Sequence, residues 1–244
     1  MRDLSGTGTA EERWRRWPQL CPSRRLDTMP EEVIVVAPHP DDEVLGAGGT
    51  LARWARAASA ITLVAVTDGE RSHPDSPTWS VDAMAHQRRA ESEAAWARLG
   101  LDFRRVVRLI VGDGEVAGSE SALTSALARL STPDTLLLAT WPGDGHPDHE
   151  AVGRAARRAA GIAGCGYACY PVWMWHWAAP ADPRVPWHRA RSVALETEFA
   201  AAKRFAAGEF VSQTQPLSAC PEDRPVLPDY ALDRLLREFE VFFV

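Results

Sequence analysis

Lysine is nearly absent from this 244-residue chain. A single lysine, Lys203, stands among 27 basic residues, and 33 acidic residues bring the formal net charge to -6. Without a basic surplus, the sequence gives no reason to expect binding to nucleic acid or to an acidic membrane surface. The isolated lysine indicates a functional position at which a guanidinium cannot replace a compact ammonium group, although compositional drift would leave the same pattern.

Long apolar runs and clustered cysteines are also missing. No apolar segment approaches the ~20 residues of a membrane span, and residues 1–30 lack the continuous apolar stretch of a secretory signal. Of the four cysteines, only Cys165 and Cys169 are close in sequence, and one close pair does not make a Cys-rich zinc site. We therefore expect a cytoplasmic protein with reduced thiols and no membrane contact.

The remaining composition is typical of one folded α/β domain, with 45% hydrophobic and 25% charged residues. Residues 1–30 are polar, rich in arginine and aperiodic, so we expect them to form a flexible, loosely packed extension. Residues 31–244 carry the periodic patterns, and we expect them to form a single domain. The sequence leaves the oligomeric state open.

Short runs of β-branched residues and leucine predict buried strands, and helical periodicities separate these runs. The first strands are expected at 33–37, 61–66, 106–111 and 135–139, and the helices at 46–59, 82–99, 119–130 and 149–162. This alternation predicts βαβ units and a mostly parallel sheet flanked by helices. Further along the chain we expect strands at 167–174 and 190–195 and helices at 196–207 and 229–240.

Two of the predicted strands run directly into clusters of histidine and aspartate. Residues 37–43 read APHPDDE after the first strand, and residues 141–149 read WPGDGHPDH after the fourth. Ligands of open α/β sheets bind at the carboxyl ends of the strands. His39 and Asp42 are three residues apart at the start of a helix and can face one point. A histidine from the second cluster would complete a three-ligand set with an open fourth position, as in catalytic zinc sites.

Local structure offers an alternative explanation for each cluster taken alone. A His-Pro-Asp loop is usually a turn, and Asp42 could simply cap the following helix. Two such loops at the ends of separate strands favour metal binding instead. The adjacent carboxylates Asp41 and Asp42 cannot easily both ligate one metal, so they predict one ligand and one base, in an order that the spacing leaves open.

With these two motifs the sequence resembles the LmbE or PIG-L family of zinc-dependent N-acetylglucosaminyl deacetylases. Weaker segments extend the resemblance over about residues 31–215: TDGE at 67–70, RRAE at 88–91, Leu99-Gly100, Asp113-Gly114, and Lys203 with Ser212-Gln213. Phe210 stands where many members have a histidine. The resemblance implies a Rossmann-like sheet and a reaction that removes the acetyl group from an amino sugar, a small-molecule partner.

The resemblance also implies a role for each residue of the two main motifs. The zinc ligands would be His39, Asp42 and His149. Asp41 would be the general base, and His146 would stabilise the oxyanion. Zinc lowers the pKa of a bound water toward ~7, and a nearby carboxylate can transfer the proton of that water to the leaving amine.

The weaker segments imply residues that bind the sugar, namely Glu70, Arg88 and Asp113. Lys203 joins this predicted substrate-binding set because it lies in the later segment and is the only lysine of the chain. The resemblance does not identify the aglycone or the length of the acyl group, since rim loops vary among family members.

Two further patterns have a functional and a structural interpretation. The glycines at 46, 48 and 49 are reminiscent of a dinucleotide-binding loop, but the acidic motif separates them from the strand, so we favour close packing of a helix on the sheet. Trp173, Trp175 and Trp177 alternate along an expected strand and could form either a sugar platform or a buried face.

Three functions remain open at this point. The first is deacetylation of an N-acetylglucosamine-bearing molecule. The second is a metal-dependent amidase or esterase that acts on a non-sugar substrate; a phosphoesterase is disfavoured because the clusters lack further bridging carboxylates and an Arg/Lys clamp. The third is a non-catalytic binding domain of the same fold, which the intact aspartates and histidines argue against.

Overall fold

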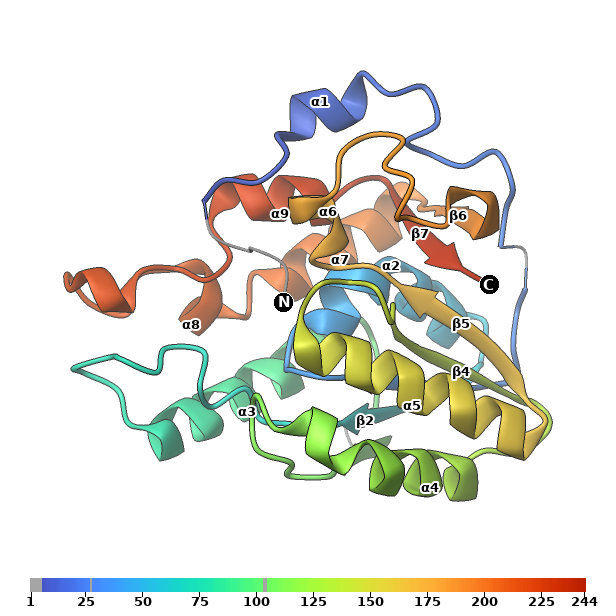
Figure 1. The fold of residues 1–244 in the computed structure, drawn as a ribbon, viewed down its shortest axis with the longest axis horizontal. Helices are drawn as coiled ribbons and strands as arrows, with labels where there is room; N and C mark the ends of the chain where they lie inside the picture. The colour runs from blue at the N-terminus through green and yellow to red at the C-terminus, as the bar shows by residue number, and fades with distance from the viewer. Residues whose placement is uncertain (1–5, 27, 103–104) are drawn as a thin grey trace.

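The computed structural model describes residues 6–26, 28–102 and 105–244. At its centre lies a seven-stranded sheet in the order β3-β2-β1-β4-β5-β7-β6 (Figure 1). The strands are β1 Glu32–Ala37, β2 Ala60–Ala65, β3 Val106–Arg108, β4 Thr135–Thr140, β5 Gly166–Tyr170, β6 Ala190–Ala194 and β7 Phe239–Phe243. Strands β1 to β5 pair in parallel, and β7 pairs antiparallel with both β5 and β6. The predicted α/β fold with a mostly parallel sheet is confirmed.

Helices cover both faces of the sheet (Figure 1). They are α1 Glu11–Arg15, α2 Asp42–Arg56, α3 Val81–Arg98, α4 Glu120–Leu130, α5 Pro147–Ala163, α6 Met174–Trp177, α7 Thr197–Ala207, α8 Val211–Thr214 and α9 Asp229–Leu235, with 3-10 turns η2 Val116–Ser119, η3 Trp187–Arg189 and η4 Pro221–Asp223. Alternate residues of β1 point to opposite faces: Val33 and Val35 join the core beneath α2, and Ile34 and Val36 join the core beneath α4 and α5. The central strand is therefore buried on both sides, which explains its continuous β-branched sequence.

Two glycines allow α2 to approach its neighbours closely. A Cβ atom at Gly46 would lie 2.0 Å from the ring of Tyr170, and one at Gly49 would lie 2.5 Å from Leu195. These contacts support helix packing, rather than dinucleotide binding, as the reason for the glycine-rich segment.

Three expected elements differ from the structure. The strand expected at 106–111 ends at Arg108. The strand expected at 167–174 ends at Tyr170, and the helix α6 follows it. The helix expected at 229–240 ends at Leu235, and β7 then fills the space between β5 and β6. In the last two cases long-range partners select the structure of a segment whose local pattern suits either form.

The N-terminal segment packs more tightly than its composition indicated. Within residues 6–26, Trp14 is fully buried, and its indole donates a hydrogen bond to the carbonyl of Trp175 at 3.0 Å. Glu11 forms a buried ion pair of 2.6 Å with Arg237. Aromatic burial and this ion pair hold the segment against the C-terminal part of the chain, whereas residues 1–5 and 27 of the expected extension lie outside the described residues.

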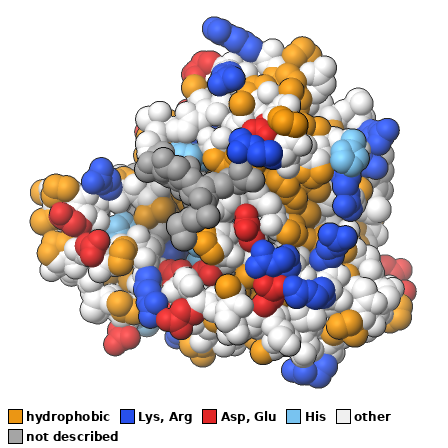
Figure 2. Space-filling view, in the orientation of Figure 1, with side chains coloured by type: hydrophobic (Ala, Val, Ile, Leu, Met, Phe, Trp, Pro, Cys, Tyr) orange, Lys and Arg blue, Asp and Glu red, His pale blue; other side chains and the backbone are white. Residues whose placement is uncertain are grey.

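The outer surface agrees with the balanced composition. On the face seen in Figure 2, positively and negatively charged side chains are interspersed, without a broad area of one sign. Among the described residues, no helix is both long enough and apolar enough to cross a bilayer.

Candidate active site

The sheet topology brings the two histidine and aspartate clusters together. Strands β1 and β4 are parallel neighbours, and the loops after Ala37 and Thr140 leave the same edge of the sheet. From β1 the chain continues through β2 and β3 on one side, whereas β5 lies on the other side of β4. The two loops therefore diverge at the switch point of the sheet, where open α/β folds form their binding crevice.

Asp42 and two histidines converge on one point. The Oδ2 atom of Asp42 lies 3.3 Å from Nδ1 of His39 and 3.2 Å from Nε2 of His149. The ring of His146 stands 4.9 Å from each of the other two imidazole rings, centroid to centroid. His39, His146 and His149 present nitrogen atoms within 4.8 Å of one another. These residues form a candidate His/Asp metal site.

The surroundings of one buried nitrogen, Nε2 of His149, indicate whether the candidate site suits a metal. Nε2 of His149 is buried and makes no well-formed hydrogen bond among the described residues, although Oδ2 of Asp42 lies 3.2 Å away. Nδ1 of the same ring lies 2.8 Å from a carboxylate oxygen of Asp144, which fixes the proton on Nδ1 in the neutral ring. The Nε2 lone pair then faces Asp42, as a histidine ligand backed by a carboxylate requires. The donor set of two imidazoles and one carboxylate fits a divalent cation such as zinc.

Asp144 connects His149 to the segment that precedes α6. Its carboxylate accepts hydrogen bonds from the backbone N–H groups of Val172, Trp173 and Met174, each at 2.9 Å, in addition to the bond with His149. The side chain is fully buried. A single carboxylate thus orients His149 and fixes the segment that enters α6.

Asp41 lies beside the metal site in an unusual conformation. Its backbone φ is 124°, a value that residues with a side chain rarely adopt and that indicates local strain. Its Oδ2 atom accepts a hydrogen bond from Arg88 at 3.1 Å. Burial raises the pKa of Asp41 to about 8, despite the opposing charge of Arg88. Asp41 is therefore a buried carboxylate that is poised for proton transfer.

The pKa values of His149 and His146 shift in opposite directions, although the two rings are neighbours. Burial opposes the charged form of His149, but Asp42 and Asp144 outweigh this effect and raise its pKa to about 9. Burial and the charge of His149 lower the pKa of His146 to about 3, so His146 is neutral at pH 7. Nδ1 of His146 accepts a hydrogen bond from the backbone of Asp148 at 3.3 Å. The proton of the neutral ring consequently lies on Nε2, where it can be donated.

His39 is oriented from its outer side by two carboxylates. Its Nε2 atom lies 3.2 Å from Asp113 and 3.2 Å from Asp148. Asp148 is fixed in turn by the backbone N–H of Gly114 at 2.8 Å. With the Nε2 proton facing these carboxylates, Nδ1 of His39 is the nitrogen that faces Asp42.

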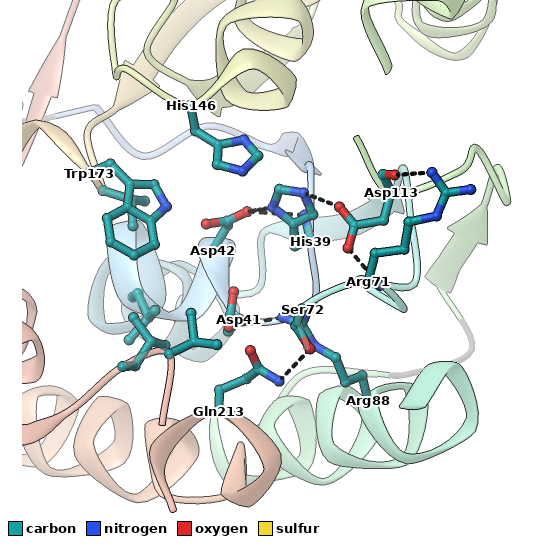
Figure 3. Close-up of a pocket in the computed structure, with 14 residues that line it drawn as sticks. His39, Asp41, Asp42, Arg71, Ser72, Arg88, Asp113, His146, Trp173 and Gln213 are labelled. Carbon is teal, nitrogen blue, oxygen red and sulfur yellow. Dashed lines mark hydrogen bonds and ion pairs between the residues drawn. The ribbon is translucent and has the colours of Figure 1, made fainter. Parts of the chain in front are cut away.

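A cavity of about 190 Å³ opens above the site (Figure 3). It is lined by His39, Asp41, Asp42, Leu45, Arg71, Ser72, Arg88, Asp113, His146, Val172, Trp173, Gln213, Val226 and Leu227. Six of the predicted site residues belong to this lining: His39, Asp41, Asp42, Arg88, Asp113 and His146. His149 lies directly behind Asp42, so the structure brings all five residues of the two main motifs together.

Two predicted sugar-binding residues occupy indirect positions. Glu70 does not line the cavity; its carboxylate accepts the backbone N–H of Asp113 at 2.9 Å and so supports that loop. Arg88 lines the cavity, but its guanidinium donates to the carbonyls of Pro40 at 2.7 Å and Gly69 at 2.8 Å, and to Asp41. In this structure Arg88 fixes the loop of the candidate base.

Lys203 corrects the sequence-based expectation. It does not line the cavity but is buried on α7, where its Nζ atom donates to Glu240 at 2.8 Å. Glu240 also accepts the backbone N–H groups of Gly49 and Thr50 in α2, at 2.9 and 2.8 Å. The lysine therefore ties α7 to β7 and α2. The structure does not place Lys203 at the cavity, so its predicted contact with the substrate finds no support; the partner that explains its burial lies 37 residues away in sequence.

The alternating tryptophans also require a correction, because α6 is a helix and not a strand. Trp175 is buried in the core beside Trp14, whereas Trp173 lines the cavity and Trp177 donates from its indole to the carbonyl of Asp144 at 2.6 Å. The three indoles thus have separate roles instead of forming one face.

Arg71, Ser72 and Gln213 line the cavity although the sequence predicted no site role for them. Arg71 and Ser72 follow the TDGE segment directly, and Gln213 belongs to the later family segment, so nearby signals existed. Gln213 is held by Ser72, whose Oγ accepts from its Nε2 at 3.2 Å. Asp144 stood inside the second motif, but its contact with His149 depends on the fold.

Comparison with known proteins identifies the family. The model of the PIG-L family, described as GlcNAc-PI de-N-acetylase, matches residues 34–160. This match covers about half of the chain and includes both motifs of the candidate site. The chain belongs to the PIG-L family.

Individual relatives agree with this assignment. A 1D-myo-inositol 2-acetamido-2-deoxy-alpha-D-glucopyranoside deacetylase of Streptomyces griseus is 30% identical over 85% of this chain and 67% of its own length. The corresponding deacetylase 2 of Catenulispora acidiphila is 32% identical over 55% of the chain; the matched region spans 53% of that relative's length. The chain thus spans about half the length of that relative. In structure, the N,N'-diacetylchitobiose deacetylase of Pyrococcus horikoshii shares the fold, with a TM-score of 0.60, 21% identity, and coverage of 86% of this chain and 80% of the other.

Proposed function

We propose that this PIG-L family protein is a zinc-dependent N-deacetylase that hydrolyses the acetamide of an N-acetylated amino sugar. The observation that carries the proposal is a buried set of two histidines and one aspartate with a second, non-ligating carboxylate, Asp41, at the adjacent position. The relatives described above are named as deacetylases of acetamido sugars, which supports the class of substrate.

His39, Asp42 and His149 would hold the zinc ion, which when bound lowers the pKa of a water molecule and polarises the amide carbonyl. The Nε2 atom of His149 supports this assignment, since it is buried and faces the Asp42 carboxylate at 3.2 Å without a well-formed hydrogen bond. Three protein ligands leave one position for water or substrate, as catalytic zinc sites require.

In the proposed reaction, Asp41 accepts a proton from the attacking water and delivers it to the leaving amine. Its contact with Arg88 and its burial keep it close to the reacting atoms. His146, which is neutral with its proton on Nε2, donates a hydrogen bond to the developing oxyanion. A donor of this kind typically contributes ~3 kcal/mol to stabilisation of the transition state.

The substrate part of the proposal rests on the remaining lining. Arg71, Ser72, Asp113 and Gln213 offer hydrogen-bond donors and acceptors on one side of the cavity. Sugar hydroxyl groups need such partners when they leave water. The mixed charges of this wall suit a neutral polyol better than a phosphate, which would select a cluster of positive groups.

The deciding experiment combines metal analysis with acetate release. We expect about one zinc per chain, loss of activity on chelation, and release of acetate from N-acetylglucosamine, N,N'-diacetylchitobiose or an N-acetylglucosaminyl inositol. A metal-loaded protein that hydrolyses only non-sugar amides or esters would assign it to the alternative amidase or esterase class. A protein that binds these sugars without any hydrolysis would be a binding domain.

A further inference from the structure

The cavity has two chemically different walls on either side of the metal site. The polar wall consists of Arg71, Ser72, Arg88, Asp113 and Gln213, and the apolar wall consists of Leu45, Val172, Trp173, Val226 and Leu227. In Figure 3, Arg71 and Asp113 lie on one side of His39 and Asp42, and Trp173 lies on the other. We propose that the apolar wall is an acyl subsite in which Trp173 restricts the enzyme to acetyl groups. This inference rests on the proposed deacetylase function.

The orientation of the substrate follows from the chemistry of its two halves. An N-acylated sugar is polar on the amine side of its amide and apolar on the acyl side. Burying the sugar hydroxyls against Leu45 or Leu227 would leave them without partners, which costs free energy that the polar wall avoids. With the amide at the metal site, the sugar therefore faces Asp113 and the acyl chain faces Trp173.

A second, smaller cavity lies beside the apolar wall. It shares Val172, Trp173 and Leu227 with the main cavity and is otherwise enclosed by Trp175, His176, Ala231, Arg234 and Leu235. Its volume of about 10 Å³ leaves room for no more than about one water molecule, so it cannot hold an acyl chain as it stands. Because Trp173 borders both spaces, its indole limits the depth available to the acyl group.

Trp173 is held through its backbone and along one edge of its ring. Its backbone N–H donates to Asp144, the same carboxylate that orients His149. Its ring packs edge-on against His176, with the ring centroids 5.9 Å apart. The depth limit is thus set by the same buried aspartate that positions a candidate metal ligand, so the reacting carbonyl and the end of the acyl subsite keep a constant separation.

The test measures how kcat/KM depends on acyl length. Zinc-loaded wild-type enzyme, Trp173→Ala and Trp173→Leu are compared on N-acetyl-, N-butyryl- and N-hexanoylglucosamine. We expect the wild type to prefer acetyl over hexanoyl by more than tenfold, since each methylene that a pocket cannot accept changes kcat/KM by about 10- to 200-fold. Trp173→Ala should raise the hexanoyl-to-acetyl ratio by about tenfold or more, and Trp173→Leu should raise it less.

Trp187→Ala is the matched control, because Trp187 is partly buried in the aromatic cluster around Trp14 and does not line the cavity. This variant should keep the wild-type ratio. If the wild type releases acetate but the ratio is unchanged in both Trp173 variants, the acyl subsite is overturned and deacetylation stands. If the metal-loaded wild type releases acetate from none of N-acetylglucosamine, N,N'-diacetylchitobiose and N-acetylglucosaminyl inositol, the subsite and the proposed function fall together.

Discussion

Two clusters of buried charge lie along α2, and they differ in how completely their atoms are paired. Midway along the helix, the carboxylate of Glu240 accepts from Lys203 and from the backbone of Gly49 and Thr50, so each of its oxygens has a partner. At the start of the helix, Nε2 of His149 faces the Asp42 carboxylate at 3.2 Å but makes no well-formed hydrogen bond among the described residues.

Backbone strain shows the same contrast. Asp41, beside the metal site, has a φ of 124°, whereas Lys203 lies within the regular helix α7. Buried charges cost free energy, and pairing of both carboxylate oxygens reduces that cost without leaving a charged oxygen to interact with a ligand. An incompletely paired cluster with local strain is instead suited to bind a metal ion or a substrate. The comparison therefore assigns the first cluster to stability and the second to chemistry.

The largest effect is expected at the incompletely paired cluster. Asp41→Asn should keep the metal but lower kcat by about 10²–10⁴-fold, because the amide cannot accept the proton. Asp42→Ala should lose metal affinity, since it removes the proposed charged ligand that lies between His39 and His149. Zinc content and kcat are measured on the same samples. An Asp41→Asn protein without metal, alongside a fully loaded Asp42→Ala protein, would reverse the two assignments.

The paired cluster should respond in stability and not in chemistry. Lys203→Met leaves the Glu240 carboxylate buried without its counter-charge, and breaking such a pair costs about 3–5 kcal/mol of unfolding free energy. Urea unfolding of Lys203→Met, Glu240→Gln and the double variant measures this cost, and the double variant should lose less than the sum of the single changes. Metal content and kcat/KM of the folded Lys203→Met protein should match the wild type. Normal stability with a reduced kcat/KM would instead support the substrate-binding role that the sequence predicted for Lys203.

The two clusters also show what could be predicted from the sequence. The candidate metal site was predictable because both motifs directly follow short apolar strands, and parallel strands deliver their carboxyl ends to one edge. The role of Lys203 was not predictable, because its partner lies on β7, a strand for which the local pattern indicated a helix. Pairing with β6 and β5 decides that segment, and no local signal reports a pairing of this kind.

The segment around Trp173 was misassigned for a related reason. Alternating tryptophans are compatible with a strand, but Asp144 accepts three successive backbone N–H groups, which turns the chain into α6 after Tyr170. The loop residues Arg71 and Ser72 could not be assigned because loops carry no periodicity. The sequence therefore predicts the strands, the main helices and the ligand motifs, while the walls of the cavity depend on tertiary contacts.

Asp144 provides a test of intermediate size, since it links a candidate ligand to the cavity wall. Asp144→Asn should weaken zinc affinity by about 10- to 100-fold, because the carboxylate behind His149 is lost. It should also speed hydrogen exchange at residues 172–174, whose N–H groups lose a charged acceptor. Asp182→Asn is the control, because Asp182 is also buried but pairs with Arg184 outside the cavity lining. Equal zinc affinities in the two variants would remove Asp144 from the metal site.

The smallest effect is expected at the surface pair Arg56 and Glu198, which joins the same two helices, α2 and α7, as the buried lysine cluster. The Nη1 atom of Arg56 and the Oε2 atom of Glu198 are 3.4 Å apart, and the side chains are 73% and 61% exposed. Water screens such a pair, so Arg56→Ala should change the free energy of unfolding by less than about 1 kcal/mol.

Salt separates this pair from the buried one. The coupling between Arg56 and Glu198, measured by a double-mutant cycle with Glu198→Ala, should fall toward zero in ~1 M salt, where the Debye length is only ~3 Å. The coupling between Lys203 and Glu240 should persist under the same conditions, because both side chains are buried and ions cannot enter between them. Equal salt sensitivity of the two couplings would mean that Lys203 and Glu240 are exposed in solution. In that case the distinction between a structural charge cluster and a reactive one would not hold for Lys203 and Glu240.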